Sequence, residues 1–401
     1  MGTRRTIRLC ALAAVLFAGT IAGPATGATA ADGLRDVLVV GNSQAGTVSF
    51  VDAHTFTNLG SINVTGDAQQ RIAAMDPIQW AGYETVTSVE GGIRWVDDAS
   101  LSPDGRTLYV SRGTLDDVAA YDLATGAQLW RTRLAGFHAD HAALSPDGTR
   151  YVVSATTADE AEVLNTADGS VAGTFATGTY PHQNDYSADG KYIYNSSIGV
   201  VSLPQALEWA KGSFRLTKVD AQTLKTVQTW TFPHGIRPNV IMPDGRTMYT
   251  DLSYLNGFVQ YDLSSSQIVK TVTMPFSTAG AALKPDDYPK NSAHHGLAVS
   301  GDGSAICDSG TIDDYAAIVN TADYSTRGTV GYPTGSLPYW ATSSTDGTLC
   351  FISLSKLNQV SVIDYATAKE VARVPVGVFP QRERTGRIAA DLIADLSPAA
   401  G

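Results

Sequence analysis

Sulfur-containing residues are scarce in this chain of 401 residues, which has three cysteines and five methionines. Cys10 falls in an N-terminal apolar stretch, so the rest of the chain contains only Cys307 and Cys350. Two isolated cysteines give no zinc-binding spacing, and the missing Cys-x-x-Cys-His motif excludes covalently attached haem c. The shortage of sulfur ligands also argues against a blue-copper electron-transfer centre.

Positive charge is in short supply as well. Lys and Arg number 28 against 39 Asp and Glu, which gives a formal net charge of −11 at pH 7. An acidic surface repels phosphate backbones and anionic lipids, so it argues against nucleic acid or a membrane surface as partner. Beyond the N-terminus, no apolar run approaches the ~20 residues that a membrane-spanning helix needs, and we expect no membrane span.

The first 30 residues have the layout of a signal peptide. Three arginines precede an apolar run over residues 9–22, and Ala28-Thr29-Ala30 supplies small residues for cleavage. The paired arginines also resemble a twin-arginine signal, which would export the folded protein. Cleavage removes three arginines and no acids, so the net charge falls from −11 to −14. We expect a secreted monomer in which residues 31–396 form one domain.

One stretch, Leu101-Ser102-Pro103-Asp104-Gly105, recurs in altered form five more times. The copies are Ser145-Pro146-Asp147-Gly148, Ser187-Ala188-Asp189-Gly190, Met242-Pro243-Asp244-Gly245, Ser300-Gly301-Asp302-Gly303 and Ser344-Thr345-Asp346-Gly347. Each copy predicts a tight turn, because Gly supplies the positive φ that the turn demands, and strand-forming residues follow it. Counted from Ser102, the turns fall 43, 42, 55, 58 and 44 residues apart. Such a period is typical of four-stranded propeller blades.

A second marker ends a strand before a polar turn within the repeats, as in Tyr121-Asp122-Leu123-Ala124-Thr125-Gly126 and Ile363-Asp364-Tyr365-Ala366-Thr367. Together, the two markers resemble the YVTN repeat family of seven-bladed β-propellers. The resemblance implies an all-β fold of seven four-stranded antiparallel blades. It implies little about activity, because propellers host many activities.

The first blade lacks an inner strand at the N-terminus. The strand-like segments 36–40 and 48–52 have no Asp-Gly turn ahead of them. Near the C-terminus, Phe379-Pro380-Gln381 is similar to the start of an inner strand at Tyr180-Pro181-His182, and residues 385–392 can pair with the first blade. We therefore expect N- and C-terminal strands to share one blade and close the ring, which removes exposed sheet edges.

Cys307 and Cys350 occupy corresponding strands of neighbouring blades, one register apart. Opposite faces of adjacent blades confront each other, so a disulfide is one outcome in an oxidising location. Two separate buried thiols are the other outcome, and the sequence leaves the choice open.

The residues that begin the inner strands should line one end of the central channel. They are Asp97, Asp98, Asp140, His141, His182, Arg237, His295, Tyr339, Gln381 and Arg382. Six of the seven histidines lie at or beside this rim, and only His54 lies elsewhere. Insertions over residues 66–95, 197–216 and 276–292 should emerge on the same face, where long connections are often functional. We expect these insertions to cover a pocket walled by Trp80, Tyr83, Trp209 and Tyr288.

Several neutral imidazoles gathered at one place are more easily explained by a metal ion than by shared protons. We predict a transition metal, with copper preferred over iron or zinc. Its predicted ligands are four histidines, namely His141, His182, His234 and His295. The predicted catalytic residues are Asp98, Asp140, Arg237 and Tyr339, with either aspartate as base or as orienting partner. His138 and His294 each adjoin a better-placed residue and are expected to be structural.

The predicted site resembles those of several propeller families. Nitrous-oxide reductase and copper-dependent thiocyanate dehydrogenase hold copper with histidines at the hub of such a fold, and cytochrome cd1 and haem-d1 biosynthesis propellers are similar. These resemblances imply a metal-dependent oxidoreductase acting on a small molecule. Streptogramin lyases and lactonases are also similar, and they imply a metal-assisted lyase with a histidine base.

Three other interpretations of the histidine-rich rim stay open. One is a metal-free pocket for a small anion or a sugar, in which Arg237 and protonated histidines act as donors. Another is a secreted binding propeller that performs no catalysis. The third is purely structural packing of the channel histidines.

Overall fold

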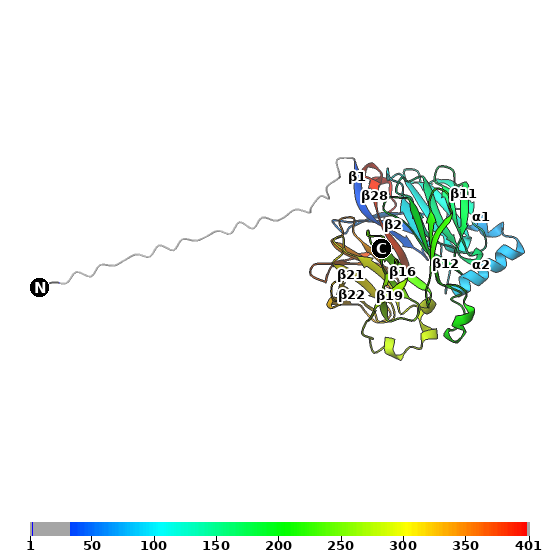
Figure 1. The fold of residues 1–401 in the computed structure, drawn as a ribbon. Coiled ribbons are helices and arrows are strands. Elements are labelled where there is room, and N and C mark those ends of the chain that lie inside the picture. Colours follow the sequence, from blue (N-terminus) through cyan, green and yellow to red (C-terminus); the bar gives the residue numbers. More distant parts are fainter. Residues whose placement is uncertain (1, 3–32, 399–401) are drawn as a thin grey trace.

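The computed structural model describes residue 2 and residues 33–398, so the predicted signal peptide lies outside the described residues. In the described part of the chain, 28 strands form seven four-stranded antiparallel sheets. The sheets follow one another around a central axis as blades of a ring (Figure 1). The predicted all-β, seven-bladed propeller is therefore confirmed.

The first strands of successive blades contact one another and surround the axis. These inner strands are β28 (Pro380–Ala389), β4 (Asp98–Leu101), β8 (Ala139–Leu144), β12 (Pro181–Tyr186), β16 (Ile236–Ile241), β20 (His294–Val299) and β24 (Pro338–Ser343). The second strands are β1 (Leu34–Asn42), β5 (Thr107–Arg112), β9 (Arg150–Ala155), β13 (Tyr192–Ser197), β17 (Thr247–Leu252), β21 (Ala305–Gly310) and β25 (Leu349–Leu354).

The outer half of each blade consists of a third and a fourth strand. The third strands are β2 (Thr47–Asp52), β6 (Asp117–Asp122), β10 (Glu160–Asn165), β14 (Arg215–Asp220), β18 (Gly257–Asp262), β22 (Tyr315–Asn320) and β26 (Gln359–Asp364). The fourth strands are β3 (Asn58–Asn63), β7 (Gln128–Arg133), β11 (Val171–Ala176), β15 (Thr226–Thr231), β19 (Gln267–Thr273), β23 (Thr326–Gly331) and β27 (Lys369–Pro375).

The hydrophobic core lies between the blades. Val39 and Phe50 of the first blade, for example, share one buried cluster with Leu108 and Val110 of the second. Both faces of a blade are covered by its neighbours, so the second strands are almost continuously buried, whereas the outermost strands are largely exposed. Burial of this kind on both faces favours the β-branched and aromatic residues that follow each predicted turn.

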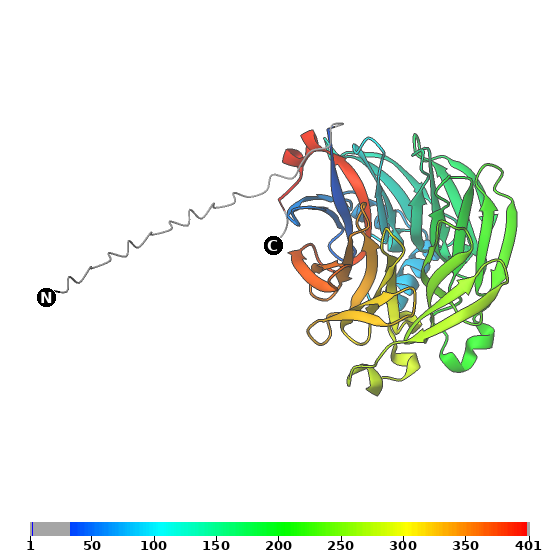
Figure 2. The same cartoon turned by 60° about the vertical axis from the view of Figure 1, so that its left-hand side comes forward.

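The ring is closed as the sequence predicts. Strand β28 pairs antiparallel with β1, with Thr385 opposite Leu38 and Ala389 opposite Leu34. Figure 2 shows these two strands, in red and dark blue, side by side in one blade. Leu392, expected at the end of this strand, lies instead in the short helix η7 (Ala390–Asp395), which packs beside the closing strand.

The repeated Asp-Gly segments are turns, as predicted. In the first of them, the Gly105 N–H donates to the carbonyl of Ser102 at 2.8 Å, and Gly105 has φ +67°. The aspartates accept backbone amides within their own turns, as Asp147 does from Thr149 at 3.0 Å. These carboxylates serve the turns and lie at the opposite end of the inner strands from the histidines.

Cys307 and Cys350 form a disulfide across neighbouring blades, with their Cα atoms 6.5 Å apart. Cys307 lies in β21 and Cys350 in β25, and both are fully buried. The choice that the sequence left open is thus decided in favour of a covalent bond between the sixth and seventh blades.

The three insertions carry helical turns that project from one side of the blades (Figure 1). The first holds α1 (Ala68–Ala73) and α2 (Pro77–Val89), the second η3 (Gln205–Ala210), and the third η4 (Gly280–Ala282), η5 (Pro285–Asp287) and η6 (Pro289–Asn291). Two single-turn helices, η1 (Gly113–Leu115) and η2 (Thr156–Ala158), join strands within blades. Within the described residues, no helix is long and apolar enough to cross a membrane.

Gly105 should contribute more to stability than its conformation alone requires. A Cβ at Gly105 would lie 2.6 Å from the backbone of Arg387 and Ala389 in the closing strand, whereas one at Gly245, with φ +63°, would meet nothing within 4 Å. We predict that Gly105→Ala lowers the free energy of unfolding by about 3 kcal/mol and Gly245→Ala by about 1 kcal/mol. Thermal and chemical denaturation measure both, and equal losses would contradict the close approach of β28 to this turn.

Candidate functional site

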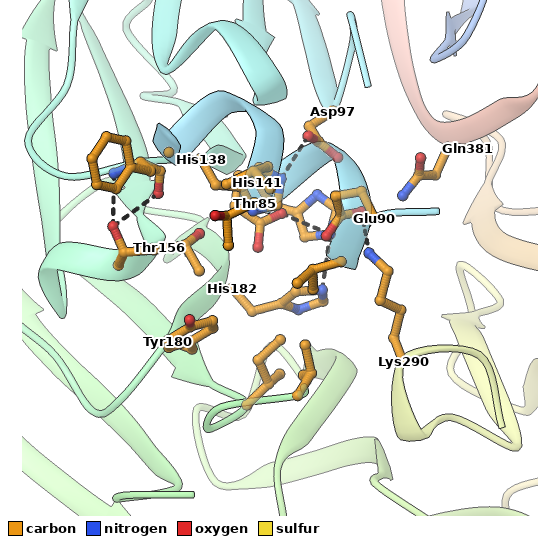
Figure 3. A pocket seen from close by; sticks show the side chains of 18 of the residues that line it. Thr85, Glu90, Asp97, His138, His141, Thr156, Tyr180, His182, Lys290 and Gln381 are labelled. Carbon is orange, nitrogen blue, oxygen red and sulfur yellow. Dashed lines mark hydrogen bonds and ion pairs between the residues drawn. The ribbon is translucent and has the colours of Figure 1, made fainter. Parts of the chain in front are cut away.

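A cavity of about 340 Å³ lies at the end of the central channel that faces the insertions (Figure 3). Its floor is formed by the first residues of the inner strands, which come from six blades. The polar residues that line it include Glu90, Asp97, His138, Asp140, His141, His182, Arg237, Lys290, His295, Tyr339 and Gln381. A volume of this size fits a small organic molecule or ion.

Each floor residue is aimed at the channel by the same local irregularity. In six blades, the register between the inner and second strands shifts by one residue at the start of the inner strand. The extra residues of these β-bulges include Asp140 with His141, His182, Arg237, His295 and Tyr339. A bulge leaves side chains outside the regular ladder and re-aims them, which is why bulges are common beside active sites.

The segment ahead of four inner strands is fixed by a repeated hydrogen bond. The amide N–H of His138 donates to Asp116 Oδ1 of the previous blade at 2.9 Å. The same bond joins Tyr180 to Asp159 (3.0 Å), Leu337 to Asp314 (3.2 Å) and Phe379 to Asn358 (3.0 Å). All four donor residues have positive φ, between 54° and 71°. Non-glycine residues adopt this region rarely, and such strain concentrates at functional sites.

His141 and His182 present their Nε2 atoms to each other at 3.0 Å on the cavity floor. Asp140 Oδ1 lies 3.5 Å from His141 Nε2, and one ligand atom from each of the three residues lies within 4.8 Å of the others. Neither Nδ1 atom has a hydrogen-bond partner among the described residues. Burial lowers the pKa of His182 well below its usual value, and electrostatic interaction with His295 and Arg237 acts in the same direction. A neutral imidazole is the form that binds metals.

Asp97 and His138 form a second acid–base group beside the first. His138 Nε2 lies 2.9 Å from Asp97 Oδ2, and Figure 3 shows the pair at the cavity wall. Burial opposes the charge of His138, but the attraction and hydrogen bond of Asp97 outweigh it and raise the pKa of His138 to about 10. Asp97, His138 and Asp140 also bring three potential ligand atoms within 4.8 Å of one another, so Asp140 belongs to both groups.

His295, Tyr339 and Arg237 also line the cavity. The ring of His295 stacks on that of Tyr339, with centroids 4.0 Å apart. Burial and the nearby Arg237 lower the pKa of His295 well below its usual value. Burial also lowers the pKa of Arg237, to about 10, so its guanidinium stays protonated at neutral pH.

Helix α2 forms an apolar wall that the sequence analysis missed. Its residues 78, 81, 82, 85, 86 and 89, which lie on one helical face, line the cavity. A local signal for the helix was present: Asp76 caps it by accepting the N–H groups of Ile78 and Gln79, and Pro77 occupies its first turn. Glu90, just past its end, forms an ion pair with Lys290 of the third insertion.

Two predicted site residues are not brought to the cavity. The Asp98 carboxylate is held by Arg384 Nε at 2.7 Å and Arg382 Nε at 3.1 Å, because β4 begins without a bulge and Asp98 stays in the ladder. The His234 side chain is 43% exposed and contacts Glu208 of η3 at 3.1 Å. Asp97, next to Asp98, is the cavity carboxylate of this blade.

Of the remaining expectations for residues at the rim, one is confirmed and the others are not. His294 lies outside the cavity, fully buried against Asp308 at 2.8 Å, as a structural role requires. His138 was expected to be structural, yet it lines the cavity. The four predicted wall aromatics are wrong, since none lines the cavity. Trp80 and Trp209 are exposed, and Tyr83 and Tyr288 are buried elsewhere.

Comparisons with solved structures agree with the fold. The chain is similar to hydrazine synthase from Kuenenia stuttgartiensis, with a TM-score of 0.56 and 16% identity over 74% of this chain and 96% of that one. It is also similar to the dihydro-heme d1 dehydrogenase NirN in complex with DHE, with a TM-score of 0.55 and 13% identity over 89% and 76% of the two chains. At these identities the likeness concerns the fold alone. No family model, including one for the YVTN repeat, and no curated protein matches the sequence.

Removing the Asp97 charge should lower the pKa of His138. We predict that Asp97→Asn lowers it from about 10 by roughly two units, because burial then acts without the opposing carboxylate. The ion pair stabilises the folded protein fully below the unfolded pKa of histidine, and this contribution is lost as pH rises through about 10. Histidine NMR titration of metal-free protein measures the shift. Asp189→Asn, which changes an exposed turn carboxylate, is the control. An unchanged pKa of His138 in Asp97→Asn would contradict the pairing.

Proposed function

We propose that this protein is an exported metalloenzyme, and specifically an oxidoreductase that acts on a small molecule in the cavity at the end of the central channel. The carrying observation is the set of three donor side chains, Asp140, His141 and His182, gathered at the floor of a buried cavity. Nitrogen atoms 3.0 Å apart can both lie at the metal–imidazole distance of about 2.0–2.1 Å from one ion. The acidic chain and its interblade disulfide support an extracytoplasmic location.

The composition of the donor set narrows the choice of metal. Two imidazoles and one carboxylate, without sulfur, suit iron(II), copper(II) or zinc, and this triad with open positions is typical of non-haem iron enzymes. We therefore place iron beside copper as the preferred ion. His295 is near enough to His182, with ring centroids 5.5 Å apart, to join as a fourth donor.

The metal would supply redox chemistry and polarise bound substrate atoms. The surrounding residues divide the remaining tasks. His138, protonated and oriented by Asp97, would hold a proton at Nε2 beside the cavity. Arg237 and Lys290 would give positive charge to the cavity lining, and the apolar face of α2 would exclude water. Tyr339 orients His295 through ring stacking and through its carbonyl, which lies 3.3 Å from His295 Nδ1.

A second candidate function is a metal-assisted lyase or hydrolase. The observation that favours it is the Asp97–His138 pair, because a protonated, oriented histidine beside a divalent ion can act as the general acid that protonates a leaving group while the ion polarises a carbonyl. This alternative uses the same cavity and requires a redox-inactive ion.

The proposed function is tested by metal content in two matched variants. We predict that His182→Ala lowers metal affinity at least about a hundredfold, since it removes a ligand and not merely a supporting residue. His234→Ala should leave the metal in place, because His234 does not line the cavity and its side chain contacts Glu208 instead. Elemental analysis, with an ultraviolet–visible and electron paramagnetic resonance spectrum of protein purified without a histidine tag, measures both.

The outcomes separate the candidates. Iron or copper at about one ion per chain, lost in His182→Ala and retained in His234→Ala, supports the oxidoreductase. Zinc or another colourless ion with the same pattern supports the lyase or hydrolase. Protein that binds no metal even after reconstitution would overturn both and leave a binding propeller.

A further inference from the structure

Arg237 is a buried cation for which the described residues provide no counter-ion. Its side chain is 1% exposed and lines the cavity, and it forms no ion pair with any carboxylate in the described part of the chain. Nε donates to Ser253 Oγ at 3.1 Å, and Nη2 donates to the carbonyl of Lys290. A guanidinium has five N–H groups, so three remain without a protein partner. Burying an uncompensated charge is costly, and such charges are normally paired.

The acids of the cavity are committed elsewhere. Asp97 pairs with His138, and Glu90 pairs with Lys290, where the attraction of that lysine overcomes burial and holds the pKa of Glu90 low. Asp140 is the remaining carboxyl, and it belongs to the donor set with His141 and His182. A divalent ion held by this single carboxylate would add to the positive charge of Arg237. The cavity therefore lacks an anion.

A second pocket that adjoins the cavity also has an excess of positively charged side chains. This outer vestibule of about 640 Å³ shares Glu90, Lys290, Tyr339 and Gln381 with the inner cavity. Its wall adds Arg94 and Lys356, so three cations face one acid in a protein whose net charge is −11. A cleft lined by one sign of charge focuses the field and attracts ligands of the opposite sign.

We propose that the substrate is a small anion of the carboxylate type, whose two oxygen atoms are bound by the free N–H groups of Arg237 in the cavity that also holds the metal donors. This inference deepens the proposed function and takes its reactive site from it. Guanidinium and carboxylate match in geometry as a planar, bidentate pair, which a lysine in the same position would not provide. The anion would complete the charge balance that the protein leaves open.

The test uses two probes of nearly equal shape, formate and formamide, which differ in charge. Isothermal titration calorimetry at constant ionic strength should detect formate binding to the wild-type protein and much weaker or no binding of formamide. Arg237→Gln should raise the Kd for formate at least about tenfold. Arg237→Lys keeps the charge but loses the planar pair of N–H donors, so its Kd for formate should lie between those of the wild-type protein and Arg237→Gln. Arg246→Gln is the control, since this arginine belongs to the same blade but lies in the turn at the opposite end.

The experiment distinguishes this inference from the proposed function. Arg237 is charged without a metal, so formate should retain its Arg237-dependent binding after chelation, although with lower affinity. If the wild-type protein binds no metal but still binds formate more tightly than formamide, the proposed function is overturned and the anion site is not. Equal binding of formate and formamide by the wild-type protein, absence of formate binding, or unchanged formate affinity in folded Arg237→Gln would overturn the anion site. The wild-type comparison decides the matter even if Arg237→Gln fails to fold.

Discussion

A hydrogen bond between neighbouring blades determines where four of the inner strands enter the channel. In each case, an Asp or Asn in the hairpin of one blade accepts the amide that precedes the inner strand of the next. The chain then passes through a residue of positive φ and through a bulge at the start of the inner strand. Regular strands would point alternate residues between the blades. The hydrogen bond and the bulge instead direct the imidazoles of His141 and His182 toward each other.

The cavity that results gathers buried charged groups at one end of a channel surrounded by apolar contacts between blades. Pairing compensates for part of this charge, as in Asp97 with His138 and Glu90 with Lys290. Arg237 and the donors around Asp140 are compensated only by something that binds. A stable fold gains nothing from these groups, since buried ion pairs are often replaceable by apolar residues without loss. The proposed ligands, a cation and an anion in the same cavity, would account for these groups.

The sequence predicts the propeller and the channel floor well because both depend on local, repeated signals. The Asp-Gly turns fix the register, so the residues at a constant offset from each turn reach the axis, as Asp140, Arg237 and Tyr339 do. Asp98 fails because its blade alone lacks the bulge, which depends on strand pairing that a single sequence does not reveal. His234 fails because η3 of a distant insertion supplies its partner. The α2 wall was missed although its Asp76-Pro77 cap is visible in the sequence.

The central claim is that the inner-strand bulges gather Asp140, His141 and His182 around a metal ion. Anomalous diffraction from crystals of the purified protein, collected above and below the absorption edges of iron, copper and zinc, tests it most directly. The account predicts one strong anomalous peak at the cavity floor, within bonding distance of both Nε2 atoms and of an Asp140 oxygen. A peak elsewhere, or none in crystals grown with these ions, would contradict the account.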